Sequence, residues 1–295
     1  MNSAFHRILG VAALCLGGNA AGAVPLRVVT LFPILTEIAR DVGGPDVAVT
    51  SLLPPGVDPH TFEPAPRDMR ALADADLVLA SGLGLENYLD KLAVNSGTRA
   101  KIVAVGDVLR DRALVVESHG RREFDPHWWN SIMATQDVVR RIADQLAELR
   151  PENAADIRGR ASELLARLGA LDAWTKEQLS VLPPGKRQLV TSHDAFGWFS
   201  RDYGFTVHPI AGLSPGAEPD AHELAQLVEL LRREKIPAVF IEDSESSKLA
   251  SALAREAGAR IGGTLYPDGL VPEADGSTYE ALFRHNVLTI VQALR

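Results

Sequence analysis

The chain has 295 residues, of which 46% are hydrophobic and 23% charged, a composition ordinary for a globular protein. At this length folding buries about 75% of the surface of the unfolded chain, so a core forms without disulfides or structural metals. Lys and Arg number 30 against 38 Asp and Glu, and the resulting net charge of −8 is too acidic for a nucleic-acid-binding surface.

The first 23 residues have the pattern of a secretory signal peptide. His6 and Arg7 form a short, weakly basic start, and an apolar run extends from Ile8 to Gly18. Ala21-Gly22-Ala23 has the small-x-small form of a signal-peptidase site. Because the apolar run is too short to span a bilayer, we expect cleavage after Ala23 and export to the periplasm.

The only cysteine of the chain, Cys15, lies inside this run and is preceded by Leu14. Leucine is a poor fit to the small residue that precedes a lipidated cysteine, so we expect a soluble exported protein. Its mature chain would contain no disulfide and no cysteine-based metal site.

Short β-rich runs alternate with helical stretches in the first half of the chain. The predicted strands are Leu26 to Leu31, Val47 to Leu53, Leu77 to Ser81 and Ile102 to Val105, and the predicted helices are Ile34 to Val42 and Asp68 to Ala75. This alternation is typical of parallel βαβ units in an open α/β sheet.

A long run rich in Ala, Leu, Arg and Glu follows, from Glu152 to Val181, with Pro151 suited to its first turn. A helix of this length would be a rod of about 45 Å. Pro183-Pro184-Gly185 ends it. A crossover within one domain is an alternative, but we favour a rigid spine between two lobes, because α/β patterns lie on both sides.

The second half repeats the α/β pattern. Its predicted strands are Gln188 to Thr191, Thr206 to Ile210, Ala238 to Ile241 and Arg260 to Leu265. Asp220 and Glu223 form a capping box for one helix, and Ser246 or Ser247 starts the next, which ends before Gly258. We therefore expect two lobes, each with a mainly parallel four-stranded sheet flanked by helices: residues 24–150 and 183–295, joined by a linker helix over 151–182.

Three histidines follow predicted strand or turn ends: His60, His127 and His193. Asp268 has the same relation to the strand before it. Ligands of open α/β sheets bind in the crevice beyond the carboxyl ends of the strands. Imidazoles plus one carboxylate make a typical tetrahedral zinc set, so these four residues are the predicted metal ligands.

Other residues that could carry chemistry receive no ligand role. They are His119, His208, His222, His285, Glu63, Glu242 and Asp243. Glu63 remains open as a substitute ligand, His208 remains open as a residue near the site, and Glu242 and Asp243 remain open as outer partners or surface charges. The chain has no His-Glu-x-x-His, Walker A or Gly-x-Ser-x-Gly motif, so we predict no catalytic residues.

Five segments together resemble the zinc- and manganese-binding extracytoplasmic solute-binding proteins of ABC uptake transporters. They are Val57-Asp58-Pro59-His60-Thr61-Phe62-Glu63-Pro64, Ala73 to Val78 with Gly82 to Glu86, Asp125-Pro126-His127-Trp128-Trp129, Thr191-Ser192-His193-Asp194-Ala195-Phe196 and Gly262-Gly263-Thr264-Leu265-Tyr266-Pro267-Asp268. Each motif alone is weak, but their order around a long central helix is specific.

The resemblance implies two α/β lobes bridged by one rigid helix, with a metal held in the cleft as transported solute. It also implies delivery to a membrane permease driven by a cytoplasmic ATPase. We expect a monomer that binds Zn²⁺, with Mn²⁺ or a broad range of divalent metals as the alternative.

Two departures from the family pattern bear on the choice of metal and on the second ligand motif. Zinc members often carry a long His-rich loop before the second ligand, whereas the Val115 to Asp125 stretch contains only His119. Asp125 stands where asparagine is commoner, and Asn130-Ser131 stand where Asp-Pro is commoner. His127 itself is unchanged.

Two other classes of protein fit parts of the pattern. A periplasmic metallohydrolase could use the same ligands, but it would need an open coordination position and a nearby general base. A metal-binding surface adhesin is disfavoured by the missing lipid-anchor signal.

Overall fold

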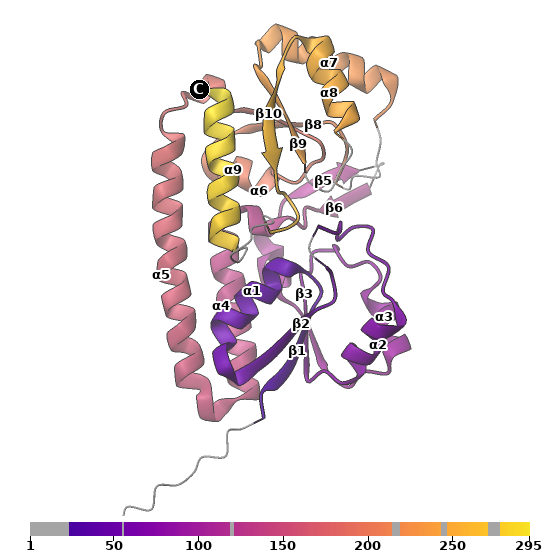
Figure 1. Ribbon diagram of the computed structural model, residues 1–295, viewed down its shortest axis with the longest axis vertical. Helices are drawn as coiled ribbons and strands as arrows, with labels where there is room; N and C mark the ends of the chain where they lie inside the picture. Colours follow the sequence, from indigo (N-terminus) through magenta and orange to yellow (C-terminus); the bar gives the residue numbers. More distant parts are fainter. Residues whose placement is uncertain (1–23, 55, 119–120, 214–218, 243–246, 271–277) are drawn as a thin grey trace, which may run out of the picture.

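The computed structural model describes residues 24–54, 56–118, 121–213, 219–242, 247–270 and 278–295. The predicted signal peptide, His119, Asp243 and Ser246 lie outside these ranges. Two α/β halves are stacked end to end, and one long helix runs beside both of them (Figure 1). Within the described residues, no helix combines the length and the apolar character that a membrane crossing requires.

The first half contains a parallel four-stranded sheet with the order β2-β1-β3-β4. Its strands are β1 (Leu26–Thr30), β2 (Val47–Ser51), β3 (Leu77–Ala80) and β4 (Lys101–Ala104), which confirms the four predicted strands. Its helices are α1 (Pro33–Gly43), α2 (Pro66–Ala73) and α3 (Leu89–Ser96). Every residue of β3 is buried, as expected for an inner strand covered on both faces.

The long predicted helix is α5 (Ala154–Leu179), preceded by α4 (Ile132–Leu149) and by a 3-10 turn over Pro151–Asn153. Its 26 residues make a rod of about 39 Å, slightly shorter than predicted because the first turn is 3-10 and the helix ends at Leu179. It packs against α1, α4 and α9 (Tyr279–Leu294) and so contacts both halves.

Two arginines join the ends of the spine helix α5 to the two halves through hydrogen bonds. Arg160 of α5 donates to the carbonyl of Gly43 at 2.7 Å and to Asp46 Oδ2 at 2.6 Å, satisfying the end of α1. Arg187, beyond the far end of α5, donates to the carbonyls of Leu179 and Tyr203 at 3.2 and 2.8 Å. Carbonyls at a helix end have no intrahelical partner, so these bonds tie each end of α5 to a different half.

The second half contains two parallel strand pairs: β7 (Gln188–Thr191) with β8 (Thr206–Pro209), and β9 (Ala238–Glu242) with β10 (Arg260–Leu265). Because β7 lies beside β9, the four strands are neighbours, but the predicted four-stranded sheet is found as two adjacent two-stranded sheets among the described residues. The flanking helices are α6 (Gly197–Tyr203), α7 (Ala221–Glu234), α8 (Lys248–Ala257) and α9.

The predicted helix ends in this half are confirmed. Asp220 caps α7 and forms the capping box with Glu223. Ser247 precedes α8, and Gly258 follows it in the left-handed conformation, with a φ of 73°. Glycine reaches that region without steric cost, so it ends the helix cleanly.

An antiparallel hairpin, β5 (Val115–Ser118) and β6 (Arg121–Phe124), is absent from the sequence prediction. The sequence predicts a loop here because the strands are short and mostly polar. The hairpin lies between the two halves (Figure 1).

The largest hydrophobic cluster contains residues from both halves, whereas the outer face of each strand layer has a smaller cluster of its own. In this cluster Trp129 and Phe32 lie with Phe283 and Leu171 of the later helices. The two halves therefore share one continuous apolar interior along α5, which resists large movements between them.

Candidate metal centre

The structure brings together all four predicted ligands. His60 lies between β2 and α2, His127 directly precedes a 3-10 turn over Trp128–Asn130, His193 follows β7, and Asp268 follows β10. One ligand atom from each lies within 4.8 Å of every other. This is the only such group of His, Cys, Asp or Glu among the described residues.

The distances between these atoms fit a small cation at their centre. Nε2 of His60 lies 3.1 Å from Nε2 of His127, and Nε2 of His193 lies 3.1 Å from Oδ2 of Asp268. Asp268 oxygens lie 3.6 Å from His127 Nε2 and 3.8 Å from His60 Nε2. Tetrahedral bonds of about 2.0–2.1 Å to zinc place ligand atoms about 3.3 Å apart.

Two carboxylates outside the cage hold two of the imidazoles. Oδ1 of Asp125 lies 2.8 Å from His127 Nδ1 and also accepts from the His127 backbone N–H at 2.9 Å. Oε2 of Glu242 lies 2.5 Å from His193 Nδ1. A carboxylate on Nδ1 keeps a proton on that atom, so Nε2 is the nitrogen that faces the centre of the cage.

These outer partners are only partly foreseen from the sequence. The sequence leaves Glu242 open between an outer partner and a surface charge, and the structure shows it buried against His193. Asp125 stands out in the sequence only as a departure from the family motif. Its position two residues before His127 could have identified it as a partner of that ring, because an Asp side chain at this spacing can reach the backbone and the ring of the ligand.

His60 is held differently. Its backbone N–H donates to Asp58 Oδ1 at 2.8 Å, and Thr61 Oγ1 donates to Asp58 Oδ2 at 3.1 Å. Its side chain is 10% exposed, against 3% for Asp268 and 0% for the other two histidines. Burial, with smaller effects of the neighbouring His127 and His193, lowers the pKa of His60 to about 3, although Asp268 opposes this shift.

The pKa values of His193 and Asp268 are shifted in opposite directions by their mutual attraction. Burial alone would lower the pKa of His193, but the carboxylates of Glu242 and Asp268 outweigh it and raise the pKa well above its usual value. Burial raises the pKa of Asp268, but His193, His127 and His60 outweigh burial and hold it below its usual range. Among the described residues, no backbone N–H bonds this buried carboxylate, and a metal ion would supply the missing partner.

The other candidates lie away from the cage. Glu63 is exposed, His222 lies 2.9 Å from Gln226 Nε2 on α7, and His285 lies 3.0 Å from the carbonyl of Thr264. None of these three residues belongs to the group of four whose ligand atoms lie within 4.8 Å of one another.

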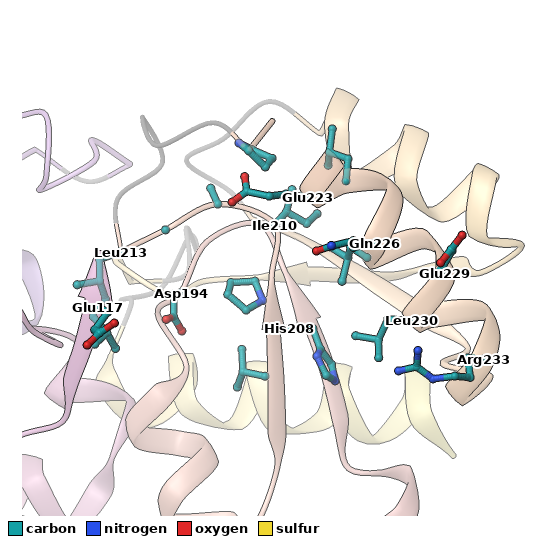
Figure 2. Close-up of a pocket in the computed structure, with 18 residues that line it drawn as sticks. Glu117, Asp194, His208, Ile210, Leu213, Glu223, Gln226, Glu229, Leu230 and Arg233 are labelled. Atoms are coloured by element: carbon teal, nitrogen blue, oxygen red, sulfur yellow. The ribbon is translucent and has the colours of Figure 1, made fainter. Parts of the chain in front are cut away.

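His208 lines a separate groove of about 840 Å³ between β8 and α7. Figure 2 shows His208 opposite Gln226, Leu230 and Arg233 of α7, with Glu117 at the other end of the groove. His208 Nε2 lies 2.7 Å from Gln188 Oε1, so this histidine is already engaged by its neighbouring strand.

Comparisons with known proteins agree with this geometry. The family model described as "Zinc-uptake complex component A periplasmic" matches residues 28–293. The manganese-binding lipoprotein MntA of Bacillus subtilis is 37% identical over 276 residues, which cover 92% of this chain and 90% of MntA. The iron-binding protein YfeA of Yersinia pestis is 31% identical, with 98% and 93% covered.

A solved structure shares the fold. The periplasmic zinc-binding protein TroA of Treponema pallidum superposes with a TM-score of 0.86 at 33% identity, covering 92% of this chain and 99% of TroA. A crystal structure of ZnuA superposes with a TM-score of 0.81 at 28% identity.

The α/β halves on one spine helix, with a buried His₃Asp cage between them, define a metal-binding substrate-binding protein of an ABC transporter. The family match extends over almost the whole described chain. The chain belongs to the family of the zinc-uptake complex component A, and the resemblance seen in its motifs is confirmed.

Proposed function

We propose that this protein captures zinc and delivers it to a membrane permease powered by a cytoplasmic ATPase. His60 and His127 bind the ion from the lobe formed by residues 24–150, and His193 and Asp268 bind it from the lobe formed by 183–295. The helix over 151–182 connects the lobes. The protein acts as a monomer in the periplasm after removal of residues 1–23.

The composition of the cage is the observation that supports zinc. Three imidazole nitrogens and one carboxylate oxygen suit a four-coordinate zinc ion, whereas manganese prefers more oxygen ligands and a higher coordination number. At a given nitrogen and oxygen site the Irving–Williams order also places zinc above manganese. The protein supplies four ligands and an enclosed cage, which suits holding an ion more than activating water on it.

Manganese is the second candidate. The relative MntA, at 37% identity, is named as manganese-binding, and YfeA is named as iron-binding. A second oxygen of Asp268 lies within reach of the cage, so a larger ion could bind both carboxylate oxygens.

Elemental analysis of protein purified without chelators or metal-affinity steps tests the cargo, and competitive titration of zinc and manganese tests the preference. We expect one tight zinc ion per chain and weaker manganese binding. Zinc at one hundred times its dissociation constant should stabilise the protein by about 2.7 kcal/mol, measured against chelator-treated protein. Tighter binding of manganese than of zinc would reverse the proposed cargo.

Transport is tested by reconstituting the protein with its permease and ATPase in vesicles. Zinc-loaded protein should stimulate ATP hydrolysis and zinc uptake, and a cage variant such as Asp268→Ala should not. The same loaded protein should turn over no ester, peptide or phosphate substrate. Such turnover, without stimulation of the transporter, would favour the metallohydrolase instead.

A further inference from the structure

The cage is divided between the two halves of the molecule. His60 and His127 come from the first half, and His193 and Asp268 come from the second. The space available to an ion therefore depends on how the halves are held against each other. The following inference rests on the proposed function, because it concerns how the same cage selects its ion.

Two side chains that lie two and three residues after His127 cross to the backbone beside both ligands of the second half. Trp129 Nε1 donates to the carbonyl of Pro267 at 2.5 Å. Asn130 Nδ2 donates to the carbonyl of Ala195 at 3.0 Å and to that of Pro267 at 3.3 Å. Pro267 precedes the ligand Asp268, and Ala195 lies two residues after His193.

Tyr279, the first residue of α9, adds further hydrogen bonds between the two halves. Its hydroxyl donates to the carbonyl of Trp129 at 2.7 Å and accepts from Thr135 Oγ1 at 3.1 Å. Its backbone N–H donates to Glu37 Oε2 of α1 at 2.5 Å. The start of a helix from the second half is therefore bound to three elements of the first half.

These hydrogen bonds are shielded from water, and the side chains that make them are closely packed. Trp129, Asn130 and Tyr279 are respectively 0%, 3% and 3% exposed. The Trp129 ring packs against Phe32 at 4.4 Å and against the imidazole of His127 at 5.4 Å between centroids. A buried carbonyl that loses its donor is costly, so the halves resist separating at this point.

The chemistry of residue 130 matters to this arrangement. An amide nitrogen donates to both carbonyls, whereas an ionised carboxylate has no hydrogen to donate. Asn130 is thus a donor placed between the two backbone segments that carry His193 and Asp268.

We propose that Trp129, Asn130 and Tyr279 are positioning residues that hold the two halves at the spacing of a small tetrahedral cage and thereby favour zinc over manganese. We call these three residues the cross-lobe clamp. They set the separation between His127 and the ligands His193 and Asp268. Loosening the clamp lets the cage widen and admit water, which suits an ion of higher coordination number.

Two variants break the clamp. Two control variants remove similar hydrogen bonds that do not join the first half to the second. Asn130→Ala and Tyr279→Phe remove the crossing bonds. Asn286→Ala removes bonds to the backbone of Tyr266 inside the second half, and Tyr203→Phe removes a hydroxyl bond to Asp172. Zinc and manganese affinities of all four are measured by competitive titration, and the melting temperature of each apo protein is recorded.

We expect Asn130→Ala to weaken zinc binding about 10- to 100-fold, the usual effect of an outer partner, and to weaken manganese binding less. Tyr279→Phe should narrow the zinc-to-manganese ratio in the same direction and by a smaller factor. The two controls should lower the melting temperature while leaving that ratio at the wild-type value.

A distance measurement reports on the clamp independently of metal affinity. The only native cysteine is Cys15, so once it is removed spin labels can be placed at Val94→Cys on α3 and Glu229→Cys on α7, both exposed. In Asn130→Ala the distribution of distances between the two labels should broaden with and without zinc. In Asn286→Ala it should keep its wild-type width.

The outcomes separate this proposal from the proposed function. If wild type binds zinc tightly but Asn130→Ala keeps both the metal ratio and the distance distribution, the clamp is refuted and zinc capture stands. If Asn286→Ala shifts the ratio as much as Asn130→Ala, general loosening sets the preference and the clamp is refuted as well. If wild type binds no zinc tightly, the proposed function itself fails.

Discussion

His60 and the pair formed by His127 and His193 complete the same cage in different ways. The paired histidines are fully buried, and each has a carboxylate on its Nδ1 atom. His60 is the most exposed of the four ligands, and its backbone N–H donates to Asp58 Oδ1 within the long connection between β2 and α2.

The difference indicates that His127 and His193 belong to a rigid wall of the cage, whereas His60 forms an adjustable side. Where a ring is fixed by a buried carboxylate, its nitrogen is aimed before the metal arrives, and no ordering is required on binding. Where the ring depends on a connecting segment, it can turn aside at lower cost. We therefore expect the metal to enter and leave past His60, with His127, His193 and Asp268 as the fixed wall.

Removing one ligand from each side tests this difference in rigidity with the largest expected effect. We expect His193→Ala to weaken zinc binding by at least about 1,000-fold, since losing an outer partner alone costs about 10- to 100-fold. His60→Ala should weaken it less, because water reaches that side and can take the vacant position. Competitive titration measures both. Equal losses would show that the two sides are equally fixed.

The outer carboxylates provide a second, smaller contrast. Glu242→Gln and Asp125→Asn should each weaken zinc binding about 10- to 100-fold, because the ring nitrogens lose a charged partner. Asp58 bonds to the backbone N–H of His60 and to the hydroxyl of Thr61, not to a ligand ring, so Asp58→Asn should change affinity several-fold less. Stopped-flow release of zinc to a chelator would show whether Asp58→Asn acts mainly on the dissociation rate, as an adjustable side requires.

Exchanging the wall ligand itself sharpens the contrast in metal preference. His193→Glu replaces a nitrogen by carboxylate oxygens and should weaken zinc much more than manganese, narrowing the ratio of their affinities. His60→Glu is the matched change on the adjustable side and should narrow the ratio less. Titration of both metals checks this. An unchanged ratio in His193→Glu would place His193 outside the cage and contradict the site assignment.

The smallest expected effect concerns Glu86, a buried carboxyl of the first half that lies outside the cage. Burial raises the pKa of Glu86 to about 7, although the backbone N–H groups of Ser81 and Gly82, at 2.6 and 3.0 Å, oppose this shift. The folded state therefore holds a proton that the unfolded chain releases near the ordinary glutamate pKa of 4.5. Its contribution to the free energy of unfolding should fall as pH rises between these values, by up to about 1.4 kcal/mol per pH unit.

Urea unfolding of chelator-treated protein at pH 5, 6, 7 and 8 tests this effect. Glu86→Gln has no proton to release, so its stability should fall less steeply between pH 5 and 7 than that of wild type. Above pH 7 the two slopes should agree. Parallel curves across the whole range would mean that Glu86 is already ionised in the folded state.

Much of the fold was predictable because the local signals were strong. The eight predicted strands are short apolar runs bounded by turn residues, and α7 begins where Asp220 and Glu223 predict. The hairpin β5–β6 was missed because its residues are mostly polar and its strands have only four residues each. Helix α4 was also missed, although Ser131 caps it and its apolar residues recur at helical spacing.

The four candidate ligands were visible in the sequence because each follows a strand or turn end, and the carboxyl ends of parallel strands converge. The outer contacts were not visible in this way. Glu242 lies 49 residues from His193, and Pro267 lies 137 residues from Asn130. No local pattern relates residues so far apart, because only packing decides which side chains meet.

By itself, the sequence therefore determined the α/β pattern, the spine helix, the family and the four residues His60, His127, His193 and Asp268. These depend on hydrophobic periodicity, helix ends and short motifs, all of which are local properties of the chain. Only the tertiary structure decided that two imidazoles are aimed by buried carboxylates while His60 is not. It also decided that Asn130 bridges the two halves, because hydrogen bonds between distant segments form only when the whole interior is packed.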